Sequence, residues 1–214
     1  PGGTPPPGHI PNCNGPLLEA LARSEHCRVT YLGIAGDRRD VLLRALERGL
    51  GHDVLLVSGG VSMGDYDLVP GALRELGVSE LFHRVRVKPG KPLYFGNREN
   101  CLVFGVPGNP VSNFTTFHVF VKPALRRLRG IPNPPSPVQA RLPRTLEWSG
   151  ERAWLVPAVA RVRDGYLEAS PLELNGSADI IGCAGCNAIM VLGEEVQVLP
   201  AGSTVSTLLL NGEG

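Results

Sequence analysis

The chain has 214 residues, of which 27 are glycine and 20 are proline, and 43% are hydrophobic. This glycine and proline content lies below the range typical of low-complexity disorder, and the length allows one large domain or two small ones with real cores. No apolar run reaches the roughly 18 residues that a membrane helix requires, so no membrane partner is expected. The chain begins with Pro1 rather than Met, and we expect it to be a piece of a longer protein.

The formal net charge of +1 averages two parts of opposite sign. Residues 1–130 carry 16 Lys/Arg against 11 Asp/Glu, whereas residues 131–214 carry 5 against 9. A basic excess of this density favours a small anionic ligand over a nucleic-acid duplex, which recruits denser basic patches. Only three of the cationic residues are lysines, and two of them, Lys88 and Lys91, lie in one short loop.

The five cysteines form an odd set without a regular framework, which indicates a reducing compartment and therefore the cytoplasm. Cys183 and Cys186 make a CxxC pair. Metal binding and two small buried residues are both possible interpretations of this pair. The second is favoured, because no further cysteine pair or nearby histidine completes a zinc site.

Up to residue 130, short apolar runs alternate with helical patterns. In chain order, the patterns predict a helix at 16–23, a strand at 28–34, a helix at 38–50, a strand at 53–58, a helix at 68–76, strands at 84–88 and 101–106, and a helix at 111–129. This order is typical of βαβ crossovers. It predicts an α/β fold, namely a three-layer α/β/α domain with a mainly parallel sheet over residues 1–130.

The stretch 131–137 contains four prolines, which predict a domain boundary because proline cannot continue a helix or a central strand. After this stretch the sequence pattern changes from alternating helices and strands to strands separated by tight turns. Beyond it, strands predicted at 155–162 and 166–172 flank Asp164-Gly165, a hairpin signal. Further strands predicted at 196–199 and 204–210 flank a second turn at 200–203. Residues 131–214 are therefore predicted to form a small β-barrel-like domain.

Three loops follow predicted strands, which is where ligands bind in open α/β sheets. The first loop, residues 58–67, contains Gly59, Gly60 and Gly64. These glycines let the backbone approach a ligand closely, and the N-terminus of the following helix favours an anion. In the alternative interpretation, Asp67 only caps that helix, with Pro70 in its first turn.

The second loop is Lys88-Pro-Gly-Lys-Pro92. Its prolines stiffen the turn and hold two ammonium groups close together, which costs free energy unless an anion joins them. A solvated turn is the alternative, and the scarcity of lysine elsewhere disfavours it.

The third loop, residues 107–112, leads into the helix predicted at 111–129. Asn109 can cap this helix, Pro110 fits its first turn, and Ser112 with free backbone N–H groups would suit a phosphate. His118 lies on the apolar stripe of the helix, so a core histidine is favoured over a catalytic one. Pro123 is expected to kink or restart the helix.

Asp37 follows the strand predicted at 28–34. It either caps the next helix, with Asp40 three residues on, or faces the same strand-end cleft as Asp67. Two carboxylates in that cleft would serve a divalent cation that bridges phosphate oxygens. The spacing leaves both interpretations open.

Together the strings Ser58-Gly-Gly-Val-Ser-Met-Gly-Asp-Tyr-Asp67, Lys88-Pro-Gly-Lys-Pro92 and Val106-Pro-Gly-Asn-Pro-Val-Ser112 resemble, in order and spacing, a known family. It is the MoeA family, the molybdenum insertases of molybdenum-cofactor biosynthesis, which includes the E domain of gephyrin. The resemblance covers residues 1–210 and implies the C-terminal half of such a protein. Residues 1–130 resemble the family's MogA-like α/β domain, related to the molybdopterin adenylyltransferases, and the rest resembles its C-terminal β-domain.

The resemblance implies a transferase that inserts molybdenum from molybdate into adenylylated molybdopterin and releases AMP, aided by Mg²⁺. Asp37 and Asp67 would be the acidic active-site groups and the metal ligands. Ser62, Lys88 and Lys91 would line an oxyanion pocket, and Ser177 would contribute from the β-domain. The remaining substrate-binding residues would be Gly59, Gly60, Gly64, Pro107, Gly108, Asn109, Pro110 and Ser112.

Family features absent from this sequence are a Thr-Gly-Asp-Glu-Leu strand before Pro1 and two N-terminal domains, through which a homodimer is expected. Arg38 and Asn12 stand where acidic residues are common in the family. Three other functions stay open: a molybdopterin adenylyltransferase, a gephyrin-like scaffold that binds a receptor peptide, and a non-catalytic molybdate- or pterin-binding domain. The β-domain argues against the first, because simple adenylyltransferases resemble only the α/β part.

Overall fold

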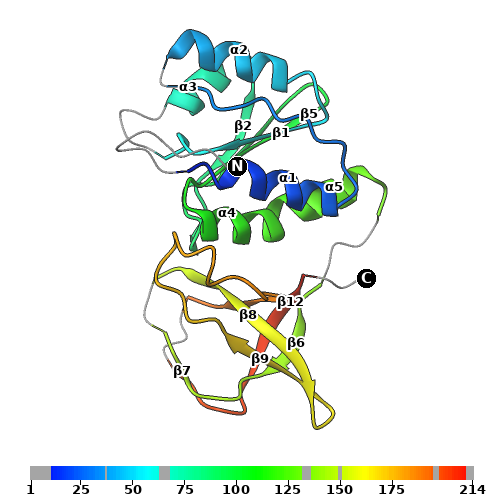
Figure 1. Cartoon of the computed structure of the whole chain (residues 1–214), viewed down its shortest axis with the longest axis vertical. Helices are drawn as coiled ribbons and strands as arrows, with labels where there is room; N and C mark the ends of the chain where they lie inside the picture. Colours follow the sequence, from blue (N-terminus) through cyan, green and yellow to red (C-terminus); the bar gives the residue numbers. More distant parts are fainter. Residues whose placement is uncertain are drawn as a thin grey trace. The chain divides into compact units, whose positions relative to one another are not determined.

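A computed structural model describes residues 11–36, 38–62, 68–131, 136–148, 151–194 and 198–210. The chain divides into two compact units, and each is described by itself (Figure 1). Unit 1 comprises Pro1–Val85 and Gly90–Phe117, and unit 2 comprises Arg86–Pro89 and His118–Gly214. Residues 132–135 of the proline-rich stretch lie outside the described residues, so a domain boundary there stays a prediction.

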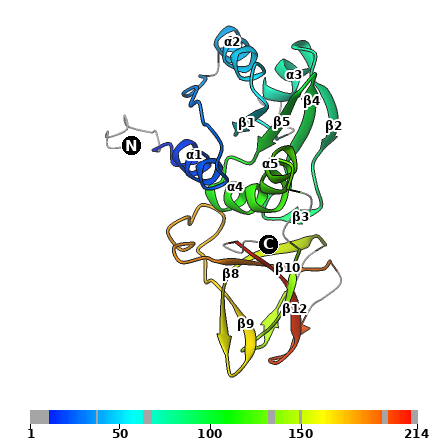
Figure 2. The ribbon, with the colours of Figure 1, turned by 90° about the vertical axis from the view of Figure 1, so that its right-hand side faces the viewer.

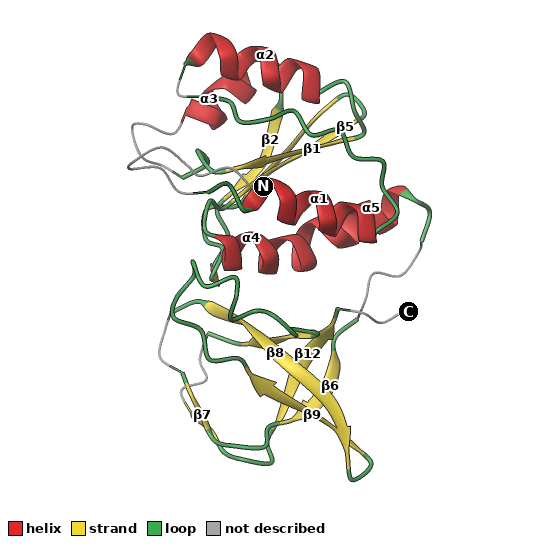
Figure 3. Cartoon of the chain, in the orientation of Figure 1, coloured by secondary structure: helices red, strands yellow, loops and turns green. Residues whose placement is uncertain are grey.

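Unit 1 combines a mixed sheet with helices. Its described elements are α1 (Asn14–Ser24), α2 (Arg39–Gly49), β1 (Val54–Ser58), α3 (Leu68–Glu75), β2 (Ser79–His83), β4 (Tyr94–Arg98), β5 (Cys101–Val106) and α4 (Pro110–Thr116). The strand order is β1-β5-β4-β2. Helices α2 and α3 lie on one side of the sheet and α1 and α4 on the other (Figure 3). Leucines of α2 and α3 share a buried core with Leu55 of β1 and Val103 of β5.

The prediction of a mainly parallel sheet is wrong for the described strands. In the described part of this sheet, β1 and β5 are the only parallel pair, whereas β4 runs antiparallel to both β5 and β2. Residues 28–34 form no strand. Val29 and Leu32 are half-buried, as the pattern indicates. A strand also needs a hydrogen-bonded partner strand, and in the described residues β1 pairs with β5 and not with residues 28–34.

Two strands of this sheet, β2 and β4, were not predicted, and the strand predicted at 84–88 does not belong to this sheet. β4 contains Gly96 and Asn97, which disfavour strands in isolation. The glycine is needed because a Cβ there would lie 2.6 Å from the carbonyl oxygen of Ser79 in β2. The strand predicted at 84–88 is reduced to β3 (Val87–Lys88), which pairs with a strand of unit 2.

The long helix predicted at 111–129 is present and changes its hydrogen-bonding pattern in the middle. α4 leads into a π-helical turn, η1 (Phe117–Val121), and then into α5 (Lys122–Leu128). Pro123 lies in the first turn of α5, so the predicted restart is confirmed. Because proline has no N–H to donate, the regular ladder cannot pass through it unchanged.

Unit 2 is built around a closed barrel. Its strands are β3, β6 (Val138–Arg141), β7 (Leu146–Glu147), β8 (Ala153–Arg163), β9 (Tyr166–Pro171), β10 (Ala188–Leu192), β11 (Val198–Leu199) and β12 (Thr204–Leu209). The order β10-β12-β6-β9-β8 closes because β8 also pairs with β10 (Figure 2). Small buried residues fill the interior, among them Ala158 and Ala188. The predicted barrel-like arrangement is confirmed, whereas its extent as a domain over residues 131–214 stays a prediction.

The hairpin signal at Asp164-Gly165 is also confirmed. These two residues connect β8 to β9 with φ angles of 50° and 79°, and a two-residue turn with both φ angles positive matches the twist of its flanking strands. By contrast, the strands near 196–199 and 204–210 do not pair with each other. β11 pairs with β7, and β12 pairs with β6 and β10.

Within the described residues, none of the helices has both the length and the apolar character that crossing a membrane would require.

Candidate functional site

The first and third loops meet at one edge of the unit 1 sheet. β1 and β5 are parallel neighbours, and their last residues, Ser58 and Val106, stand in register. The Gly59 N–H donates to the carbonyl oxygen of Val106 at 3.1 Å. A Cβ on Gly108 would lie 3.6 Å from the Cα of Gly59. The structure therefore brings together the loop after β1 and the loop after β5, as the rule for parallel strand ends predicts.

The first loop depends on glycine for its conformation. Gly59 and Gly60 have φ angles of 82° and 66°, in the left-handed region that side chains disfavour. Nothing lies within 4 Å of a Cβ added at Gly59, so backbone conformation alone explains that residue. Ser62, two residues further on, is exposed.

Polar side chains that the sequence did not single out hold these loops together. Asn113 is fully buried, and its Nδ2 donates to Ser58 Oγ at 2.8 Å. Asn14, at the start of α1, donates to the carbonyl oxygen of Gly108 at 2.6 Å. The Nε2 of His83 lies 2.7 Å from the carbonyl oxygen of Val61. These contacts join residues far apart in the chain, so no local signal pointed to them.

The residues predicted in the third loop differ in exposure. Gly108 and Asn109 are exposed, whereas Pro107 and Ser112 are buried. Asn109 stands at the N-cap of α4, yet its side chain makes no capping hydrogen bond, contrary to our expectation. Instead its carbonyl oxygen accepts from the N–H of Asn113 at 2.9 Å, the backbone bond that starts the helix. Pro110 lies in the first turn as predicted.

The two lysines of the second loop belong to different compact units. Lys91 is in unit 1, where its carbonyl oxygen accepts from the N–H groups of Val85 and Leu93, each at 3.0 Å. Lys88 is in unit 2, and its ammonium nitrogen lies 5.2 Å from the centre of the Trp148 ring.

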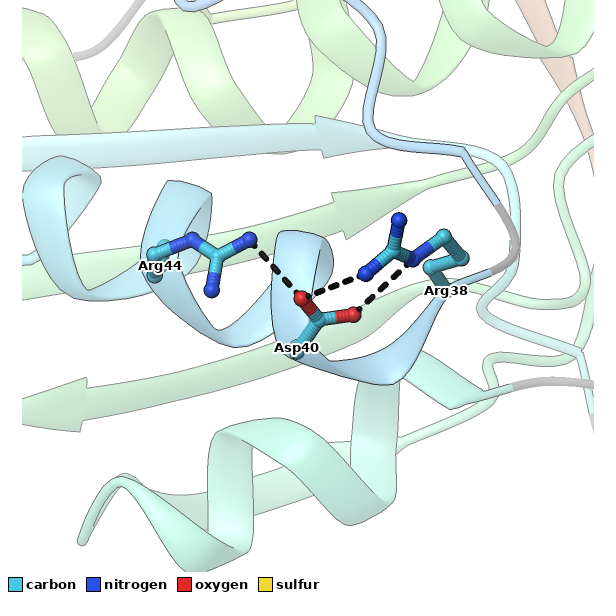
Figure 4. Close-up of polar contacts among 3 residues, drawn as sticks. All are labelled: Arg38, Asp40 and Arg44. Atoms are coloured by element: carbon cyan, nitrogen blue, oxygen red, sulfur yellow. Dashed lines mark hydrogen bonds and ion pairs between the residues drawn. The ribbon is translucent and has the colours of Figure 1, made fainter.

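The candidate acidic residues Asp37 and Asp67, together with Gly64, lie outside the described residues. The described carboxylate nearest in sequence to Asp37 is Asp40, which forms ion pairs with Arg44 at 2.9 Å and Arg38 at 3.0 Å (Figure 4). Hydrogen bonds from Arg44 and then Arg38 lower the pKa of Asp40. Because this carboxylate is already bound by two guanidinium groups, it is not a ready metal ligand.

Other candidate ligands among the described residues form no metal cluster. No group of three His, Cys, Asp or Glu residues is arranged to hold an ion in that part of the chain. Cys183 is buried and Cys186 half-buried, and both are free thiols. Burial, and then the neighbouring Cys186, raise the pKa of Cys183 to about 11. Cys183 matches the interpretation as a small buried residue, whereas Cys186 is buried only in part.

His118 is a core residue, as predicted. Its side chain is 6% exposed. Burial, and then the charge of Lys122, lower the pKa of His118 to about 3, so the imidazole is neutral at physiological pH.

The described residues thus define a two-part α/β protein, in which a mixed sheet with loops meeting at two parallel strand ends is combined with a closed five-stranded barrel. Loops at such strand ends are where open α/β sheets bind ligands. Residues 4–127, more than half of the chain, match the family model MoCF_biosynth, "Probable molybdopterin binding domain". The chain belongs to this family of molybdopterin-binding domains.

Similarity to individual relatives extends over both units. The chain is 30% identical over 209 residues to the molybdopterin molybdenumtransferase of Bacillus subtilis, covering 97% of this chain and 49% of that protein. It is 28% identical over 205 residues to the Staphylococcus epidermidis molybdopterin molybdenumtransferase, covering 95% of this chain and 49% of the relative. The chain thus spans about half the length of these curated relatives.

Solved structures agree with the fold. The molybdopterin biosynthesis MoeA protein of Pyrococcus horikoshii superimposes with a TM-score of 0.82 at 28% identity, covering 99% of this chain and 51% of that one. A molybdenum cofactor biosynthesis protein of Pyrococcus furiosus gives a TM-score of 0.72 at 30% identity, covering 92% and 64% of the two chains. The resemblance to the MoeA family inferred from three sequence motifs is confirmed.

Proposed function

We propose that this chain carries substrate-binding parts of a molybdopterin molybdenumtransferase, which inserts molybdenum from molybdate into adenylylated molybdopterin and releases AMP in molybdenum cofactor biosynthesis. The observation that carries the proposal is that similarity to molybdenumtransferases covers 95–97% of the chain and so includes the barrel. An adenylyltransferase would explain only the α/β part, which makes it the weaker candidate.

The adjoining loops after β1 and β5 are the proposed phosphate- and pterin-binding edge. Gly59, Gly60 and Gly108 allow the backbone to approach the substrate, and exposed Ser62 and Asn109 offer polar groups there. Pro107, Pro110 and Ser112 shape the loop. Because Ser112 is buried, its proposed part is structural rather than a direct contact with phosphate.

Lys88 and Lys91 are the proposed cationic groups for oxyanions such as molybdate. An ammonium group acts on an oxyanion as a compact point charge with three N–H donors. Gly64, which belongs to the first loop, is also proposed to line the substrate site.

Asp37 and Asp67 are proposed as the acidic active-site residues and as ligands of Mg²⁺. Carboxylate oxygens are the ligands this ion prefers, whereas the described Asp40 is held by two arginines and is not proposed as a ligand. When bound, Mg²⁺ would offset the negative charge of phosphate oxygens.

We further propose a three-layer α/β domain over residues 1–130, a β-domain over 131–214, a homodimer, and a location in the cytoplasm.

The test is AMP release from adenylylated molybdopterin by the intact protein, with and without molybdate. We expect release to depend on molybdate and to fall by on the order of tenfold or more in Asp67→Ala and in Lys88→Ala, because both remove a charge proposed to act on the substrate. Arg48→Ala, which removes an exposed cation of α2, is the matched control and should leave the rate unchanged.

Unchanged rates in both Asp67→Ala and Lys88→Ala would show the site assignment to be wrong. ATP consumption without molybdate would favour an adenylyltransferase. Tight molybdate binding without AMP release would favour a binding domain, and receptor-peptide binding without turnover would favour a scaffold.

A further inference from the structure

The side chain of Lys88 lies over a pair of stacked indole rings in unit 2. Its Nζ is 5.2 Å from the centre of the Trp148 ring. Trp148 stacks on Trp154, with ring centres 4.4 Å apart and planes inclined by 18°. These two residues are the only tryptophans of the chain. An ammonium group over an indole face is attracted by the quadrupole of the ring, and tryptophan is the strongest aromatic partner for it.

The main chain fixes Lys88 to the same place. β3 pairs in parallel with β8, and Lys88 stands in register with Trp154. On the preceding residues, the Ala153 N–H donates to the carbonyl oxygen of Arg86 at 3.0 Å, and Arg152 donates to that of Val87 at 3.4 Å. Backbone pairing and aromatic contact therefore restrain both ends of the Lys88 residue.

Arg86 and Lys88, two neighbouring cations of unit 2, differ in whether a carboxylate compensates their charge. Arg86, two residues earlier, has its charge compensated by an ion pair with Glu194 at 2.7 Å. For Lys88, no carboxylate in the described part of the chain forms an ion pair. The aromatic contact orients the ammonium without neutralising it, because a ring carries no net charge. Trp148 is 5% exposed whereas Lys88 is exposed, so a rigid buried support holds a charge that solvent and solutes can reach.

We propose that Trp148, backed by Trp154, is a positioning residue that holds the Lys88 ammonium ready to bind an oxyanion. The identity of that anion as molybdate rests on the proposed function. Trp148 acts through Lys88, so the two side chains must be energetically coupled in anion binding.

The test is a double-mutant cycle read out by the fluorescence of the two tryptophans during titration of the 214-residue chain with molybdate. We expect wild type to respond, Trp148→Leu to bind molybdate about five- to tenfold more weakly, and Trp148→Phe to stay within about threefold of wild type because it keeps a ring under the ammonium. Lys88→Met should weaken binding more. In the Lys88→Met background, Trp148→Leu should add nothing. Trp154 remains as the reporter in every variant.

Tyr166→Leu is the matched control, since it removes another aromatic ring of unit 2 that lies under a cation, Arg141 at 3.4 Å. It should leave molybdate affinity unchanged. Should Trp148→Leu fail to fold, the cycle is completed with Trp148→Phe and Trp148→Tyr against Lys88→Met. Equal losses from Trp148 substitutions with and without Lys88, or no response of wild type to molybdate, would overturn the proposal.

In the AMP-release assay of the intact protein, Trp148→Leu should raise the KM for molybdate and leave kcat within about twofold. Molybdate binding that depends on Trp148 and Lys88 without AMP release would contradict the proposed function and leave the positioning role supported. AMP release with an unchanged KM for molybdate in Trp148→Leu would support the proposed function and contradict the positioning role.

Discussion

At the scale of single residues, burial makes His118 a determinant of stability at acid pH. The unfolded chain binds a proton at the ordinary histidine pKa of about 6.5, whereas the folded state does so only near 3. Between these values the unfolded state binds more protons, so stability falls as the pH falls, by at most about 1.4 kcal/mol per pH unit. Above pH 6.5 the histidine is neutral in both states, so this loss of stability is absent.

We therefore predict that wild type loses about 1–2 kcal/mol of unfolding free energy through His118 between pH 6.5 and 5. Urea denaturation at several pH values measures this loss. His118→Leu should remove that part of the pH dependence, whatever its effect at pH 7, whereas substitution of exposed His52 by Gln should retain it. Identical pH profiles for wild type and His118→Leu would contradict a buried neutral histidine.

At the scale of elements, Gly105 sets how closely β5 approaches the first loop. A Cβ on Gly105 would lie 2.6 Å from Cγ1 of Val61 and 3.0 Å from Cβ of Tyr94, and both neighbours are buried. Gly105→Ala should therefore lower the free energy of unfolding by about 1–3 kcal/mol, the usual cost of overpacking. Circular dichroism during urea denaturation measures it.

The control for this prediction is Gly71→Ala in α3, where nothing lies within 4 Å of an added Cβ. Alanine in an exposed helical position should raise stability by about 0.5–1 kcal/mol. A Gly105→Ala variant as stable as wild type would mean that Val61 shifts freely, and that the first loop is not held where the structure has it.

Elements with a strong local pattern could be predicted, and those that depend on partners could not. The helical patterns at 16–23, 38–50 and 68–76 match α1, α2 and α3 closely, because amphipathic spacing is local. β4 escaped prediction because Gly96 is explained only by β2 beside it. In the candidate site, glycine-rich loops were visible in the sequence. Asn14 was not, because its contact with Gly108 joins residues that only the fold brings together.

At the scale of the whole molecule, each compact unit has a core of its own, and closure of the barrel is the central feature of unit 2. The closing pair of strands, β8 and β10, places Ala158 opposite Ala188, both fully buried. Because both residues are fully buried, a larger side chain at either position would have to displace its neighbours. Ala158→Leu should therefore strain this pairing and destabilise the barrel by about 1–3 kcal/mol or more.

Native-state hydrogen exchange tests whether the strain stays within unit 2. Because the two cores are separate, amides of β8, β10 and β12 should exchange faster in Ala158→Leu, while those of β4 and β5 keep their protection. Val162→Leu in the same strand enlarges a side chain that is 77% exposed, and it should change neither set. An equal rise of exchange in β4 and β5 would mean that the units open together. Substitutions in the barrel would then lower activity through global stability, and Trp148 would have to be judged by its coupling to Lys88 rather than by loss of activity alone.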